Sequence, residues 1–183
     1  MSEVTQILDS LDRGDPQAAD RLLPLVYDEL RKLAAAKMAR ESLGQTLQPT
    51  ALVHEVYVRV FAHNPPETRT RSHFMALAAQ VMRRFLVDHA RTRRAEKRGG
   101  LQDAVPLDQS FVYDARKSGE FLAVHEALER LRQWDPRQSQ IVEMRYFGGM
   151  SEEEVAEYLG ISSRTVKRDW AMARAWLHAE LSA

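Results

Sequence analysis

The chain has 183 residues, and its 26 lysines and arginines balance 26 acidic residues, so the formal net charge is zero. A chain of this length can form one domain or two small ones. The absence of cysteine excludes disulfides, thiol catalysis and cysteine-bound zinc. The first residues are polar and acidic, unlike a signal peptide, and no apolar run is long enough to span a bilayer. We therefore expect a soluble, cytoplasmic protein with no membrane partner.

Charge is distributed unevenly along the chain. Residues 1–30 carry seven acidic and two basic side chains, whereas residues 83–98 carry seven basic side chains and two acidic ones. A neutral total that separates into an acidic end and a basic stripe indicates one surface that faces a polyanion.

The spacing of apolar residues is helical in almost every periodic segment, and no stretch alternates like a β-strand, which predicts an all-α fold. In chain order, a short opening helix should end near Gly14, and Asp15-Pro16 is typical of the start of a second helix. Pro24 lies inside that second helix and is expected to kink or restart it. The next helix should begin at Pro49.

A long helix should follow, with Ser72 as its cap, and its periodicity fades after residue 98. Helical spacing resumes near residue 120, and Asp135-Pro136 marks one more helix start. The predicted organisation is two small helical modules, residues 1–98 and 120–183, joined by a flexible linker, residues 99–119.

Residues 151–170 predict two short helices joined by a tight turn. Ser151 can cap the first helix, Glu154 completes the capping-box pattern, and Gly160 lies where the chain must turn sharply. The inner face of the second helix consists of Val166, Trp170, Ala173 and Leu177. A packed back and a basic front are typical of a helix that enters the DNA major groove. The alternative is an ordinary helical hairpin with solvated lysines and arginines.

The helix after Ser72 is apolar in its first half and basic in its second half. Arg84, Asp88, Arg91 and Arg94 follow one another at roughly helical spacing. Such a stripe can follow DNA phosphates and would make binding depend strongly on salt. The alternative is a solvated helix end whose bases favour the C-terminal dipole.

Nothing in the sequence favours catalysis. The chain has no glycine-rich phosphate loop, and neither His54-Glu55 nor His125-Glu126 extends to the H-E-x-x-H metal pattern. We therefore expect a protein that is not an enzyme and that needs no cofactor or metal.

With these features in place, residues from about 20 to 181 resemble an extracytoplasmic-function (ECF) sigma factor of bacterial RNA polymerase, in the sigma-70-like family. The matching stretches are LVHEVYVRVFA at 52–62, the basic helix at 73–100, VPLD at 105–108, and 138–177. Residues 52–62 are similar to the helix that binds the polymerase clamp, and the basic helix at 73–100 is similar to the helix that meets the minus-ten element. Residues 105–108 are similar to the start of the linker, and 138–177 to the module that reads the minus-thirty-five element. The resemblance implies a region 2-like module and a region 4-like helix-turn-helix module.

The resemblance also implies a function and its residues. The protein would bind the clamp of the beta-prime subunit of core RNA polymerase and direct promoter-specific transcription initiation. The implied contacts of the recognition helix with promoter DNA are Ser163, Arg164, Thr165, Lys167, Arg168 and Arg174. Those of the minus-ten module are Arg69, Arg71, Arg83, Arg84, Asp88, Arg91, Arg94 and Arg98, with Arg69 and Arg71 in the loop expected to capture a flipped base. The implied polymerase contacts are Leu52, Val53, Glu55, Val56 and Arg59.

The chain departs from the family pattern just before Leu52. Many members carry a short acidic run there, which meets basic residues of the clamp, whereas this chain has Gln48, Pro49, Thr50 and Ala51. We therefore hypothesise that a Ser/Thr protein kinase phosphorylates Thr50, because a phosphate adds about −1.5 to −2 charges where a helix N-terminus favours anions. The alternative is that Thr50 is simply a helix-start residue.

Two other readings of the function stay open. One is a sigma-like regulator that binds an anti-sigma factor or another partner protein without recognising a promoter, but the basic Arg164, Lys167 and Arg168 argue against it. The other is an ordinary repressor or activator, which would leave the basic stripe of residues 83–98 unexplained.

Overall fold

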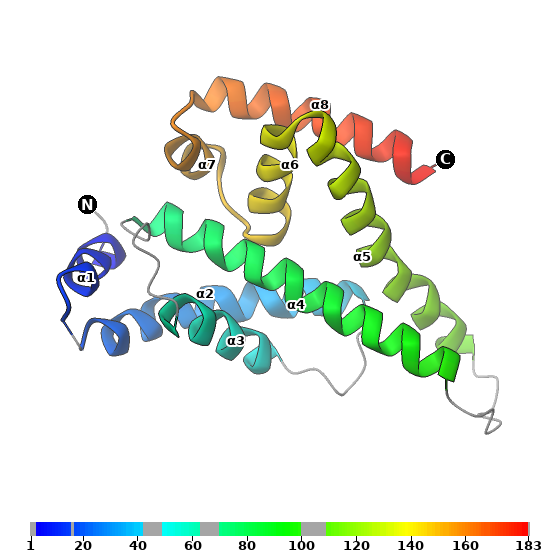
Figure 1. Ribbon diagram of the computed structural model, residues 1–183, viewed down its shortest axis with the longest axis horizontal. Helices are drawn as coiled ribbons and strands as arrows, with labels where there is room; N and C mark the ends of the chain where they lie inside the picture. The colour runs from blue at the N-terminus through cyan, green and yellow to red at the C-terminus, as the bar shows by residue number, and fades with distance from the viewer. Residues whose placement is uncertain (1–2, 16, 42–48, 63–69, 100–108, 183) are drawn as a thin grey trace.

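The computed structural model describes residues 3–15, 17–41, 49–62, 70–99 and 109–182 (Figure 1). Its helices are α1 (Glu3–Asp12), α2 (Ala18–Glu41), α3 (Pro49–Ala62), α4 (Arg71–Gly99), α5 (Gln109–Trp134), α6 (Pro136–Val142), the π-helical turn η1 (Glu143–Phe147), α7 (Glu152–Leu159) and α8 (Ser163–Ser182). The regular elements of these residues are all helical, which confirms the prediction of an all-α fold. None of the described helices has the length and apolarity that crossing a membrane requires.

Helix α4 runs through the middle of the molecule (Figure 1). It contacts α3 on one side and η1 and α7 on the other, and α5 packs along it. The sequence explains this position, because apolar side chains occupy several faces of α4. Phe74, Met75, Ala78, Met82 and Leu86 are all buried. A helix that is apolar on most faces must be covered on most faces.

One apolar core extends through both predicted modules. It includes Leu8, Leu22 and Leu52 from the first three helices, and it continues to Phe121 in α5 and Phe147 in η1. The two predicted modules therefore pack directly on each other in this structure. We call the surface where α4 meets α5, η1 and α7 the seam.

Gly148 allows a close approach at the seam. A Cβ atom added at this residue would lie 2.6 Å from the carbonyl oxygen of Met144 and 3.0 Å from the Cβ atom of Ala79 in α4. Both distances are shorter than ordinary contacts between heavy atoms, so a larger residue would clash with the backbone of η1 itself and would also press against Ala79 of α4.

Several helix boundaries agree with the sequence signals. Helix α3 begins at Pro49, and Asp135 caps α6 by accepting a hydrogen bond from the Gln138 backbone N–H at 3.0 Å. The second helix begins at Ala18, slightly later than the Asp15-Pro16 signal predicted, and Pro24 lies inside it. This helix continues through the proline without a second helix start.

The cap of α4 differs from the prediction. Thr70, not Ser72, accepts the hydrogen bond from the His73 backbone N–H, at 3.3 Å. The Ser72 hydroxyl is buried and donates to the Glu157 carboxylate of α7 at 2.7 Å. The Ser72 hydroxyl, which local spacing assigned to the cap, therefore binds Glu157 of a distant helix instead.

The predicted linker, residues 99–119, also differs in part. Residues 100–108 lie outside the described residues, but α5 begins at Gln109, so the rest of the segment is helical. The backbone can extend an established helix by one hydrogen bond per residue without an apolar face, provided that no proline interrupts it. The last proline before α5 is Pro106.

Candidate nucleic-acid interface

Helices α7 and α8 form the predicted helix-turn-helix. The Ser151 hydroxyl oxygen accepts from the Glu154 backbone N–H at 3.2 Å, and the Glu154 carboxylate accepts from the Ser151 N–H at 2.8 Å, so the capping box is confirmed. Gly160 adopts the left-handed conformation, with φ of 64°, at the turn. The Ser162 hydroxyl then accepts from the Thr165 N–H at 3.1 Å and caps α8. Local signals therefore suffice to build this motif.

The two faces of α8 have the predicted characters. Val166 and Ala173 are completely buried against the core, while Trp170 and Leu177 are partly buried. Among the predicted recognition residues, Arg164, Lys167, Arg168 and Arg174 are exposed, and Ser163 and Thr165 are half-buried. The guanidinium of Arg174 lies 5.8 Å from the centre of the Trp170 ring, a cation–π contact that restrains this side chain.

The sequence reasoning missed Asp169, whose side chain is only 2% exposed. One carboxylate oxygen accepts a hydrogen bond from Nε of Arg137, in the first turn of α6, at 2.8 Å. Nη2 of the same guanidinium lies 2.7 Å from this oxygen and completes the ion pair. The other oxygen accepts a hydrogen bond from Nε of Arg168 at 3.1 Å and forms an ion pair with Nη2 of Arg168, also at 3.1 Å. A signal was present, because Asp169 lies three residues after Val166 and four before Ala173, on the inner face of the helix. A carboxylate at such a position needs cationic partners.

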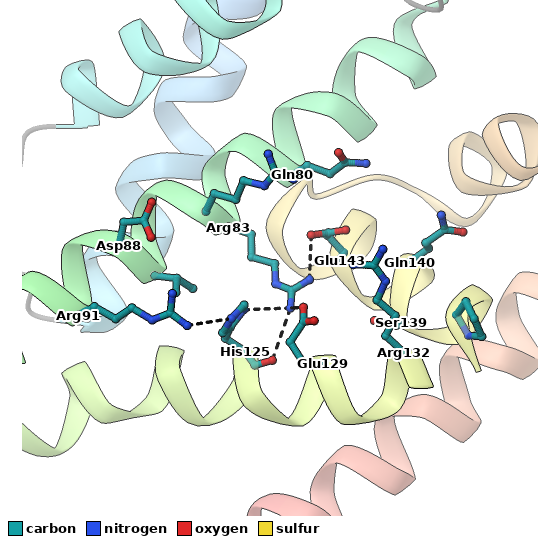
Figure 2. Close-up of a pocket in the computed structure, with 13 residues that line it drawn as sticks. Gln80, Arg83, Asp88, Arg91, His125, Glu129, Arg132, Ser139, Gln140 and Glu143 are labelled. Atoms are coloured by element: carbon teal, nitrogen blue, oxygen red, sulfur yellow. Dashed lines mark hydrogen bonds and ion pairs between the residues drawn. The ribbon is translucent and has the colours of Figure 1, made fainter. Parts of the chain in front are cut away.

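Arg83 of α4 points into the protein rather than toward solvent (Figure 2). Its side chain is 7% exposed, and its guanidinium donates to Glu143 of η1 at 3.1 Å and to Glu129 of α5 at 2.7 Å. A third contact, at 3.0 Å, joins it to Nδ1 of His125. The sequence placed Arg83 among the DNA contacts, but α5 and η1 cover its face of α4, so this arrangement does not present it to DNA.

A cavity of about 350 Å³ opens beside Arg83, between α4 and the helices α5 and α6 (Figure 2). His125 lines it, and Nε2 of this histidine lies 3.5 Å from Nη2 of Arg91. The pKa of His125 is lowered, first by burial and then by the positive charge of Arg83. Arg91 lowers it further, while Glu129 opposes the shift. Burial and the neighbouring arginines therefore favour the neutral form of this imidazole.

Charged groups also join the modules at the beginning of α4. Arg71 forms ion pairs with Glu29 of α2 and with Glu154 of α7, and it is mostly buried. Beside it lies the hydrogen bond from Ser72 to Glu157. Arg71, another predicted DNA contact, is thus engaged by carboxylates from both modules.

The other predicted residues of the minus-ten module divide into two groups. Arg84, Asp88 and Arg91 are exposed on α4. Arg69, and the side chains of Arg94 and Arg98, lie outside the described residues.

The predicted polymerase contacts on α3 also divide into two groups. Leu52, Val53 and Val56 are buried in the core, so their side chains do not reach the surface. Their spacing puts them on the inner face of the helix, where α2 and α4 cover them. Glu55 and Arg59 are partly exposed and form an ion pair with each other. They are the members of this predicted set that a partner could reach.

The packed α7 and the basic, exposed α8 define the chain as a helix-turn-helix protein. Its sequence also matches the family model described as ECF sigma factor over residues 1–183. The chain therefore belongs to the ECF sigma factor family, as its sequence motifs predicted. No curated protein matches the chain. Membership implies promoter-directed transcription with core RNA polymerase and promoter DNA as partners.

Proposed function

We propose that this protein binds core RNA polymerase and directs it to a promoter whose minus-thirty-five element is read by α8. The observation that carries the proposal is the exposed basic face of α8 on a fully packed helix-turn-helix. Arg164 can pair with a guanine edge through two hydrogen bonds, which contributes about 1–3 kcal/mol of discrimination. Lys167 more often holds phosphates, which contributes affinity without sequence preference.

In this proposal, the exposed arginines of α4 form a second contact with the promoter. Arg84 and Arg91 would hold the phosphates of the displaced strand at the minus-ten element. Unpairing bases costs a few kcal/mol, so the binding energy of polymerase must offset part of it. Arg83 can contact DNA only when the seam opens, because α5 and η1 cover it.

An in vitro transcription experiment tests this function. The full chain is mixed with core polymerase and a promoter library, and the transcripts are sequenced. We expect shared upstream motifs, and Arg164→Ala should relax the preference at one position by about 5–150-fold. Arg130→Ala is the matched control, because Arg130 is an exposed arginine of α5 whose ion pair with Glu180 lies away from the recognition residues. Failure to bind core polymerase, with or without phosphorylation, would refute the proposal. Core binding without promoter selection would favour the partner-binding regulator.

We further propose that phosphorylation of Thr50 switches polymerase binding on. Thr50 is exposed and is the second residue of α3, directly after Pro49 at the first helical position. The described part of this helix has no acidic residue in its first turn. A phosphate would supply the negative charge for the basic clamp at a helix end that favours anions.

The test of this switch adds a Ser/Thr protein kinase and ATP to the transcription reaction. We expect the kinase to stimulate the wild type and the control Ser182→Ala, which lacks an exposed hydroxyl at the end of α8. Thr50→Ala should stay inactive, and Thr50→Glu should be partly active without the kinase. Equal transcription from the Ala and Glu variants would end the switch hypothesis and leave an anti-sigma factor or synthesis as the means of control.

A further inference from the structure

The two arginines that Asp169 binds come from different helices but end side by side. Arg137 is the second residue of α6, directly after Pro136, and Arg168 lies on the exposed side of α8. Their side chains are 45% and 64% exposed, whereas Asp169 beneath them is 2% exposed. The carboxylate therefore lies under both guanidinium groups.

Each guanidinium keeps hydrogen-bond donors free for a ligand. Both arginines use Nε and Nη2, which lie on one edge of the group, to bind Asp169. A guanidinium has five N–H donors, so the opposite edge, with Nη1, remains available on each arginine. One negative charge is shared by two positive ones, and the cluster keeps a net positive charge.

The burial of Asp169 favours a restrained arrangement of the two arginines. A buried carboxylate that loses its partners is strongly destabilising, so the folded protein holds the arginines against it. Arginine normally loses much rotamer freedom when it binds a ligand. Here the fold itself has already restricted both side chains, which lowers the cost of binding.

We propose that Asp169 is a positioning residue that holds Arg137 and Arg168 as a paired clamp for the phosphates of the DNA backbone beside the recognition helix. This makes Arg137 a DNA contact outside the helix-turn-helix. The inference rests on the proposed function, because it requires that α8 face promoter DNA. Phosphate is the ligand that fits, since a planar guanidinium edge donates two parallel hydrogen bonds to it.

The test measures binding of a promoter duplex, selected from the library experiment, to the full chain with core polymerase. Arg137→Ala should weaken binding at least about tenfold, equally for selected and random duplexes. It should also reduce the slope of log affinity against log salt by about 0.9. Arg130→Ala should change neither quantity. If Arg137→Ala binds both duplexes like the wild type, Arg137 is not a DNA contact and the inference is wrong.

A double-mutant cycle separates positioning from a purely structural role. In Asp169→Asn the arginines lose their common anchor, so adding Arg137→Ala should cost much less than it does in the wild type. Equal costs in both backgrounds would overturn the positioning role. Should Asp169→Asn fail to fold, Arg137→Lys replaces it: this variant keeps the charge and the salt slope, but affinity should fall. Unchanged affinity would also overturn the inference.

The same measurements distinguish failure of this inference from failure of the proposed function. If the function fails, the wild type does not bind the selected duplex and Arg164→Ala has no effect. If only the inference fails, the wild type binds, Arg164→Ala relaxes the sequence preference, and Arg137→Ala leaves binding unchanged.

Discussion

The ion pairs of Arg83 predict how strongly the seam holds the two modules together. The perturbation is the double variant Glu129→Gln and Glu143→Gln. It preserves the shape of both side chains but removes the two negative charges that pair with Arg83, whose side chain is 7% exposed. Removing the partners of a buried charge costs about 3–5 kcal/mol. Glu129 is itself 46% exposed, so solvent already screens part of its contribution. We therefore expect a loss of about 3 kcal/mol in the free energy of unfolding.

This loss is large enough to measure. A chain of this size should lose about 2–4 °C in Tm per kcal/mol, which predicts a decrease of about 6–12 °C. The assay is urea and thermal unfolding of the full chain, followed by circular dichroism. Hydrogen exchange of the α4 amides reports whether the seam opens before the core unfolds.

Two further variants control the reasoning. Glu180→Gln removes an exposed ion pair with Arg130 and should cost less than about 1 kcal/mol. Adding Arg83→Met to the double variant removes the uncompensated charge and should recover most of the lost stability. If the double variant unfolds at the same urea concentration as the wild type, Arg83 does not depend on these carboxylates and the reasoning is refuted.

Two other variants address single side chains. Burial and the charge of Arg83 lower the pKa of His125 from its ordinary value of 6.5. The contribution of His125 to the free energy of unfolding is therefore fully present above pH 6.5. It is lost as the pH falls from 6.5 through the lowered pKa of the folded protein. Urea midpoints measured from pH 7.5 to 5.5 should fall less for His125→Gln than for the wild type. The charges of Arg91, Glu126 and Glu129 also act on this imidazole. Equal pH dependence of the two midpoints would exclude His125 as the cause. Gly160→Ala should cost about 1–2 kcal/mol because φ is +64° there, although no atom lies within 4 Å of the added Cβ. Thermal unfolding checks this value, and an unchanged Tm would contradict it.

The features predicted best from the sequence are those whose signals are local. The turn between α7 and α8 depends on Ser151, Glu154 and Gly160, which act within a few residues of one another. The start of α3 depends on Pro49 in the same way. Caps and turns need no knowledge of the rest of the fold, so reading them from the sequence is reliable.

The features that sequence reasoning missed depend on contacts between distant residues. The helical spacing of Arg83 was visible, but not that α5 and η1 would cover its face of α4. The position of Asp169 followed from spacing, but its partner Arg137 lies 32 residues earlier in the chain. Leu52 belongs to a family motif and also to the core, and only the packing of α3 shows that its side chain is inaccessible.

The core that continues through both modules couples folding to affinity. A ligand that binds only the open arrangement has an apparent affinity reduced by the fraction of molecules that are open. If about 1% of the molecules were open, such a ligand would bind about 100-fold more weakly than to separated modules. Substitutions at the seam, such as at Gly148, could therefore change DNA affinity without touching a DNA-binding residue. Selection on interior residues would then also change the protein concentration at which the promoter is half occupied.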